Sequence, residues 1–126
     1  MMGTRAIYTF VDINGEDECT VYKHYDGYPR GAADFIENAK SYAWKFPRYE
    51  ADEFAAAFVA ANKSPEGGGV RLVSDPKSYN WCDYHYIIFM DRYYQDLWVE
   101  IQEPSGMRWK TIWEGTHTAM REKVAA

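Results

Sequence analysis

A chain of 126 residues in which 47% are hydrophobic and 17% aromatic can build a core, which excludes disorder over its whole length. We expect a single domain spanning residues 1–126. The formal net charge is −5 and the Lys and Arg residues are scattered, so nonspecific nucleic-acid binding, which needs clustered cations, is not expected. No apolar run approaches the roughly 20 residues of a membrane-spanning helix, so we expect no membrane partner.

The first third of the chain predicts a β-hairpin. Residues 5–12 are rich in β-branched and aromatic side chains, and Cys19–His24 has the same character. Asn14 and Gly15 stand between them, a dipeptide that suits the positive φ angles of a tight turn.

Two helices are expected to follow. After a turn rich in Gly and Pro at residues 26–31, the apolar spacing changes to about 3.6. The stripe from Ala32 to Ala43 predicts an amphipathic helix, which Pro47 ends. A second helix is expected from about Glu50 to Asn62 because of its alanine-rich sequence.

The remaining sequence predicts four strands, at Val70–Val73, Tyr84–Met90, Leu97–Gln102 and Met107–Trp113. Tyr84–Met90 is apolar on both faces, which is typical of a central strand. In the third of these strands, Trp98 alternates with apolar neighbours and should lie on the opposite face. The alternation in the fourth places Trp109 and Trp113 on one face. From Thr116 onward we expect a short helix or a frayed tail.

The order of elements is therefore ββααββββ. It predicts an α+β domain with an antiparallel sheet of about five to six strands and two helices packed on one face. The other face must be solvated, covered by a partner, or both.

The junction between the returning strand and the first helix is the leading candidate for a ligand site. Lys23 and Arg30 can hold a phosphate or carboxylate there, helped by the free N–H groups at the start of the helix. His24 can exchange a proton near neutral pH, and Tyr25 or Tyr28 can stack on a base. The alternative is that this segment only builds the turn, with both of its glycines supplying the turn geometry.

A second candidate is an aromatic interface on the C-terminal strands. Its members are Tyr93, Tyr94, Trp98, Trp109 and Trp113. A small core cannot enclose all of the large rings in this chain. Exposed aromatic patches usually mark contacts, so this surface predicts a protein partner or a second copy of the chain.

The cysteines and histidines predict neither a metal site nor a cofactor. Cys19 and Cys82 lie far apart and outside CxxC spacing, so we expect reduced thiols and a cytoplasmic location. No two of the three histidines have the HxH or HxxxH spacing of metal ligands. Cys82 and His85 do not form a nucleophilic pair if both lie on one strand, because an odd separation places them on opposite faces.

Two motifs carry a resemblance to a known family. Residues 2–8 read Met-Gly-Thr-Arg-Ala-Ile-Tyr, and residues 22–31 read Tyr-Lys-His-Tyr-Asp-Gly-Tyr-Pro-Arg-Gly. They resemble a family of small proteins of bacteriophages, prophages and plasmids, which pair an opening Gly-Thr-Arg with an Asp-Gly-Tyr-Pro turn. The likeness is clearest over residues 2–31 and continues more weakly through residues 46–63. It carries no activity, so it implies context rather than mechanism.

That context favours a non-enzymatic binding protein of phage or mobile-element origin. Small acidic proteins of mobile elements often block host machinery, so the resemblance implies an anti-CRISPR-like inhibitor of a host defence complex in the bacterial cytoplasm, acting by protein–protein contact. One alternative is a module that sequesters a nucleotide or another small anion at the Lys23–Gly31 junction. A third class is a small enzyme that uses His24 with Asp26.

Overall fold

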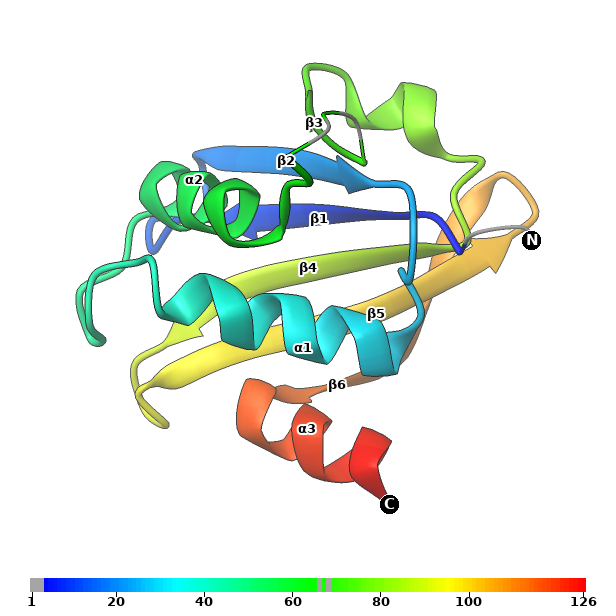
Figure 1. The fold of residues 1–126 in the computed structure, drawn as a ribbon. Helices are drawn as coiled ribbons and strands as arrows, with labels where there is room; N and C mark the ends of the chain where they lie inside the picture. The colour runs from blue at the N-terminus through cyan, green and yellow to red at the C-terminus, as the bar shows by residue number, and fades with distance from the viewer. Residues whose placement is uncertain (1–3, 66, 68) are drawn as a thin grey trace.

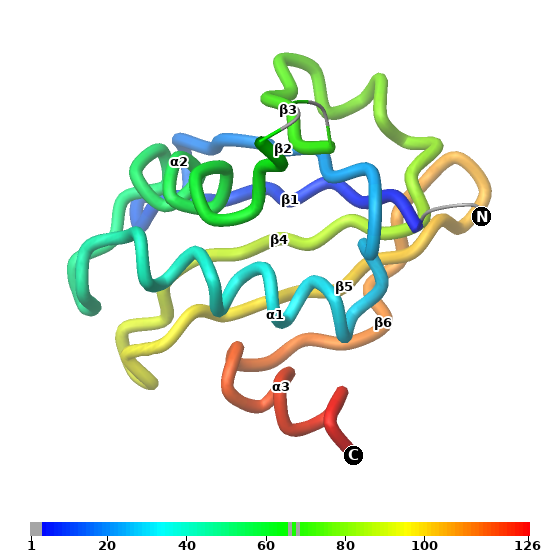
Figure 2. The backbone as a smooth tube through the Cα atoms, viewed as in Figure 1, coloured from blue at the N-terminus to red at the C-terminus, as the bar shows by residue number. Residues whose placement is uncertain are grey.

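The computed structural model describes residues 4–65, 67 and 69–126, and these residues form an α+β fold. Its mixed sheet has six strands in the order β3-β2-β1-β4-β5-β6 (Figure 1). The strands are β1 (Ala6–Val11), β2 (Glu18–Lys23), β3 (Val70–Val73), β4 (Tyr84–Asp91), β5 (Asp96–Ser105) and β6 (Arg108–Thr116). The helices are α1 (Pro29–Lys40), α2 (Ala51–Asn62) and α3 (His117–Ala125), with a short 3-10 helix η1 (Pro76–Tyr79). Figure 2 shows the sheet passing behind α1 and α2.

The predicted hairpin is confirmed. Strands β1 and β2 pair antiparallel, with Ala6 opposite Lys23. Gly15 in the connecting loop has a φ of 74°, a left-handed angle that glycine adopts without strain. Strand β4 is central, as its apolar faces predicted, because it lies between β1 and β5.

The prediction of a purely antiparallel sheet is wrong, because β1 and β4 pair in parallel. Ala6 lies opposite Tyr84, and Phe10 lies opposite Ile88. The chain between these two strands passes through β2, both middle helices and β3. A connection of this length can return the chain to the same end of the sheet, which parallel pairing requires.

Helix α1 ends at Lys40, before the end of the predicted stripe at Ala43. The Ser41 hydroxyl donates a hydrogen bond to the carbonyl oxygen of Asn38 at 2.7 Å. Such a local side-chain bond competes with continuation of the helix. Helix α2 agrees with its prediction to within one residue at its start.

The segment after Thr116 is a helix, so the described residues contain three helices rather than two. Thr116 is the N-cap of α3, and its side-chain hydroxyl accepts a hydrogen bond from the backbone N–H of Ala119 at 3.1 Å. This cap satisfies an N–H group that has no partner within the helix.

All three helices pack on one face of the sheet. Ile36 of α1, Phe58 of α2 and Met120 of α3 share a single buried cluster with Tyr8 and Val99 of the strands. Side chains alternate along a strand, so the residues between these strand positions lie on the opposite face. We call that opposite side of the sheet the open face.

One end of the open face is covered by the chain that precedes β4. Ile7, Tyr22 and Cys82 form a small buried cluster there, against which Tyr79 packs. Cys82 and His85 both lie on this side of the sheet, contrary to the parity prediction, because Cys82 precedes β4 and is not part of the strand.

Candidate functional site

Lys23, the first of the predicted ligand residues, is buried. It lies on the helix-facing side of β2 and is only 8% exposed. Its Nζ lies 4.2 Å from the centre of the Phe35 ring of α1. Burial lowers the pKa of the Lys23 ammonium group, and the nearby Asp26 opposes that shift. Lys23 therefore packs against the helix layer.

Arg30 also has a partner within the fold. Its Nε and Nη2 donate hydrogen bonds to the carbonyl oxygen of Val124 at 3.1 and 2.7 Å. This contact joins the start of α1 to the end of α3. Tyr28 is the N-cap residue of α1; its side chain is exposed and makes no capping hydrogen bond.

His24 lies at the end of β2, where its Nδ1 is 2.7 Å from the hydroxyl oxygen of Tyr22. Its ring meets the Tyr25 ring edge-on at 4.6 Å. Within the described residues, no hydrogen bond or ion pair links any two of the four predicted ligand residues. The structure therefore distributes them over separate environments.

The glycines of the junction have a steric role. The Gly27 backbone N–H donates to the carbonyl oxygen of Thr4 at 2.8 Å, and the Gly27 carbonyl accepts from the buried Tyr86 hydroxyl at 2.5 Å. A Cβ at Gly31 would lie 2.1 Å from the carbonyl oxygen of Asp26. The interpretation of these glycines as turn residues is confirmed.

The predicted aromatic interface is divided between the two faces of the sheet. Trp98 lies on the open face as predicted, directly opposite Phe89. Trp109 also lies there, with its ring 5.3 Å from the His85 ring. Trp113 pairs with Ile101 and packs against the helix-side core.

The prediction that Trp109 and Trp113 share a face is wrong because the β5–β6 pairing contains an irregularity at Ile101 and Gln102. An extra residue in one strand shifts the alternation by one position. Side chains before and after Ile112 therefore follow different parities. A prediction from side-chain alternation assumes an unbroken strand, so it does not reveal such a shift.

Tyr93 and Tyr94 occupy the turn between β4 and β5. They are 87% and 57% exposed, which places them among the more exposed large side chains of the described chain. The Tyr94 ring stacks 6.1 Å from the Trp98 ring, so this turn extends the aromatic surface beyond the strand ends.

A line of polar side chains crosses the open face beside these aromatic residues. The hydroxyl oxygens of Thr9 and Thr20 lie 3.0 Å apart, and the Thr9 hydroxyl is 2.8 Å from Nε2 of His85. Burial lowers the pKa of His85, so its imidazole is neutral at pH 7. This line is an uncharged part of the face.

Negative charge gathers farther along the same face. Glu100 on β5 lies directly opposite Glu114 on β6. The Glu100 carboxylate accepts hydrogen bonds from the Gln102 amide at 2.9 Å and from the Thr111 hydroxyl. Glu114 is exposed. We call Phe89, Trp98, Glu100 and Glu114 the acidic–aromatic patch.

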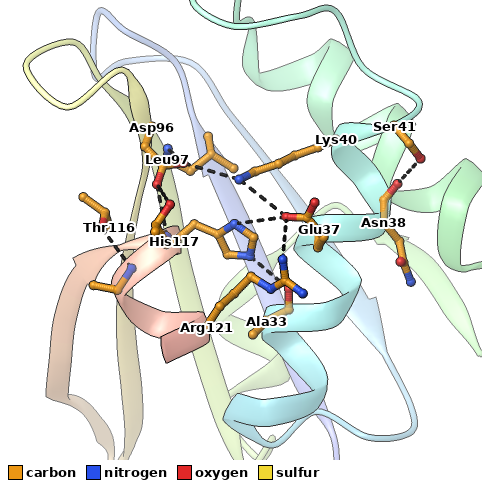
Figure 3. Close-up of polar contacts among 12 residues, drawn as sticks. Ala33, Glu37, Asn38, Lys40, Ser41, Asp96, Leu97, Thr116, His117 and Arg121 are labelled. Atoms are coloured by element: carbon orange, nitrogen blue, oxygen red, sulfur yellow. Dashed lines mark hydrogen bonds and ion pairs between the residues drawn. The ribbon is translucent and has the colours of Figure 1, made fainter. Parts of the chain in front are cut away.

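A second polar network joins α1 and α3 on the helix side (Figure 3). The Nε2 of His117 is 2.9 Å from the carbonyl oxygen of Ala33, and Glu37 lies 3.3 Å from Arg121. Lys40 reaches Asp96 at 3.4 Å. Burial acts to raise the pKa of Asp96, but hydrogen bonds from Thr118 and the charge of Lys40 outweigh it, so the pKa is lowered. These contacts hold α3 on the sheet.

Sequence reasoning identified Trp98 but missed the rest of the acidic–aromatic patch. Glu100 follows Trp98 by two positions, so strand alternation already placed both on one face. Phe89 and Glu114 come from neighbouring strands, and only the register between strands brings them to Trp98.

Comparison of the chain with protein-family models, curated proteins and solved structures finds no match. Among the described residues, no helix is long and apolar enough to cross a membrane. The described residues also contain no group of three or more His, Cys, Asp or Glu side chains that could hold a metal ion.

Proposed function

We propose that this chain is a non-enzymatic protein of phage or mobile-element origin that inhibits a host defence complex by direct contact in the bacterial cytoplasm. The acidic–aromatic patch is the contact surface, and its partner is a basic protein surface. The origin rests on the resemblance over residues 2–31. The mode of action rests on the patch.

The observation that carries the proposal is the pairing of two carboxylates across β5 and β6. Like charges directly opposite each other in a sheet are destabilising. Neither Glu100 nor Glu114 forms an ion pair with a Lys, Arg or His among the described residues. A cation from a partner would relieve this repulsion, and electrostatic complementarity of this kind gives specificity and a faster association rate.

The aromatic side chains support the same surface. Phe89 and Trp98 are paired across β4 and β5, and both remain partly exposed. Interface centres are enriched in aromatic residues, and their most important members cluster. Tyr94 adds a further exposed ring at the edge. A surface that combines aromatic rings with carboxylates lacking an ion pair fits a partner that presents arginine or lysine.

The test is affinity capture from a bacterial host lysate with three forms of the chain: the unchanged protein, Glu114→Lys and Glu122→Lys. Both variants make the same charge change at an exposed glutamate. Glu114 lies on the open face, whereas Glu122 lies on α3 in the helix layer. We expect one partner at a fixed ratio to be captured by the unchanged protein and Glu122→Lys, and capture by Glu114→Lys to fall by about tenfold or more.

Rising salt should weaken the capture, because exposed charges are screened. Equal capture by the two variants would contradict the proposal. So would association of the chain with itself that Glu114→Lys abolishes, because the occupant would then be a second copy.

A further inference from the structure

A cluster of arginines and aromatic rings lies at the end of the open face where β1 and β4 begin. Four separate segments of the chain supply its members: Arg5, Tyr22, His24, Arg71, Tyr79 and Trp81. The Tyr22 ring is central, with the Tyr79 ring at 5.2 Å and the Trp81 ring at 5.7 Å. We call this group the arginine–aromatic cluster.

Both arginines lie over these rings. The Arg71 Cζ is 5.3 Å from the centre of the Tyr22 ring, and the Arg5 Cζ is 5.8 Å from the centre of the Trp81 ring. Both guanidinium groups also act electrostatically on the Tyr22 hydroxyl and oppose the effect of burial on its pKa, so both lie in its neighbourhood. Cation–π attraction uses the positive charge of a guanidinium and not its N–H groups, which remain able to donate.

Neither guanidinium forms an ion pair with a carboxylate of the described residues. The chain has 19 acidic against 14 basic residues, so a shortage of carboxylates does not explain this. The carboxylate of Asp83 lies close to Arg5, but it accepts a hydrogen bond from the Arg5 backbone N–H at 3.0 Å. Two arginines that lie near one tyrosine and lack an ion pair can bind a phosphate or carboxylate with paired N–H bonds.

His24 adds a further polar group. Its Nδ1 lies 2.7 Å from the Tyr22 hydroxyl oxygen, so Nε2 is the ring nitrogen left to bond a ligand.

The exposed ring of Trp81 indicates what the other half of the ligand is. Trp81 is 53% exposed, although its indole N–H already donates to the carbonyl oxygen of Ser78 at 2.9 Å. The ring is thereby fixed, and a large part of its surface is free to contact solvent. Fixed, exposed aromatic rings beside cations stack on nucleobases, because every base has a flat aromatic face.

We propose that the arginine–aromatic cluster binds a nucleoside phosphate, with the phosphate on Arg5 and Arg71 and the base on Trp81. This ligand site is separate from the acidic–aromatic patch and does not depend on it. The site also differs from the Lys23–Gly31 junction, since His24 is the one residue of that junction that belongs to the cluster.

The test is an NMR titration of the isotope-labelled chain with adenosine 5′-monophosphate, adenosine and inorganic phosphate as separate probes. The signals to follow are the Trp81 indole N–H and the arginine side-chain N–H groups. The monophosphate should give saturable shifts, with half-saturation at a concentration about tenfold lower than for either fragment, because it alone engages both halves of the site.

Two variants and a control complete the design. Arg71→Gln, at an exposed position, should weaken monophosphate binding about tenfold, whereas Arg92→Gln in the β4–β5 turn should leave it unchanged. Trp81→Leu should reduce monophosphate affinity to that of inorganic phosphate. The proposal is overturned if no saturable shift occurs up to about 10 mM monophosphate. Equal effects of Arg71→Gln and Arg92→Gln, or equal binding of monophosphate and either fragment, would also overturn it.

Discussion

His117 is an ionisable side chain that the fold encloses completely, and its environment makes it neutral. Its Nε2 lies 2.9 Å from the carbonyl oxygen of Ala33 and donates to it. Burial lowers the pKa of His117, and the positive charge of Lys40 lowers it further. The hydrogen bond to Ala33 and the charges of Asp96 and Glu37 oppose the shift without cancelling it. The folded chain therefore resists protonation at this position.

This resistance predicts how stability changes with pH. An unfolded histidine has a pKa near 6.5, so below that pH the unfolded chain binds a proton that the folded chain does not. The stabilising contribution is complete above about pH 6.5 and declines as the pH falls toward the lowered pKa of the folded state, by up to about 1.4 kcal/mol per pH unit. The pKa of His85 is also lowered by burial, so it adds a decline of the same sign.

Urea unfolding at about pH 7.5 and about pH 5.5 measures this effect. We expect the free energy of unfolding of the unchanged protein to fall between the two conditions, and that of His117→Gln to fall by less. The comparison uses the difference between the two pH values, so a general loss of stability in the variant does not affect it. An equal fall in both proteins would show that His117 is not the titrating group.

For single residues, the sequence predicted the role of those that act only on their neighbours along the chain. Gly27 and Gly31 were expected to shape a turn, and the close contact between Gly31 and Asp26 explains why that turn admits no side chain. Lys23 was expected at the ligand site because it lies near the end of the predicted strand, at its junction with the first helix. Its burial depends on Phe35, which α1 brings over it from the next element, and no local pattern indicates that contact.

Among the elements, α3 depends most clearly on residues outside itself. Thr116 caps its start, Asp96 accepts hydrogen bonds from the backbone N–H and the hydroxyl of Thr118, and Arg30 holds the carbonyl of Val124 near its end. A helix of this length is not stable alone in water, so tertiary contacts must supply its stability.

Replacement of Arg30 by alanine should therefore loosen the end of α3 rather than abolish a ligand site. We expect faster amide hydrogen exchange in the last turn of α3, by about fivefold to tenfold, because a hydrogen bond to a charged group is lost. Exchange in α2 should stay unchanged, which provides the internal control. The binding of adenosine 5′-monophosphate should also stay unchanged. Unaltered exchange in α3 together with weaker binding would instead assign Arg30 to the ligand.

The strands show where periodicity succeeds and where it fails. The alternation of β5 correctly placed Trp98 opposite to its apolar neighbours. In β6 the same reasoning failed at Trp113, because the irregular pairing changes parity partway along the strand. The third helix was foreseen only as one of two outcomes, since its anchors lie in α1 and β5.

Over the whole molecule, placing the three helices on one side leaves a sheet face with two chemically different ends. The arginine–aromatic cluster lies where β1 and β4 begin, and the acidic–aromatic patch lies on β4, β5 and β6. The sequence predicted an open face and an aromatic surface. It did not predict this division, because the parallel pairing of β1 with β4 decides which residues become neighbours across the sheet.

The proposed function requires that the open face, and not the helix layer, contacts the partner. Hydroxyl-radical footprinting of the captured complex tests it most directly, because it reports the solvent exposure of individual tryptophans. Trp98 lies on the open face, and the exposed Trp44 lies in the connection between α1 and α2. We expect the partner to reduce oxidation of Trp98 several-fold and to leave oxidation of Trp44 unchanged. Protection of Trp44 with unchanged oxidation of Trp98 would contradict it.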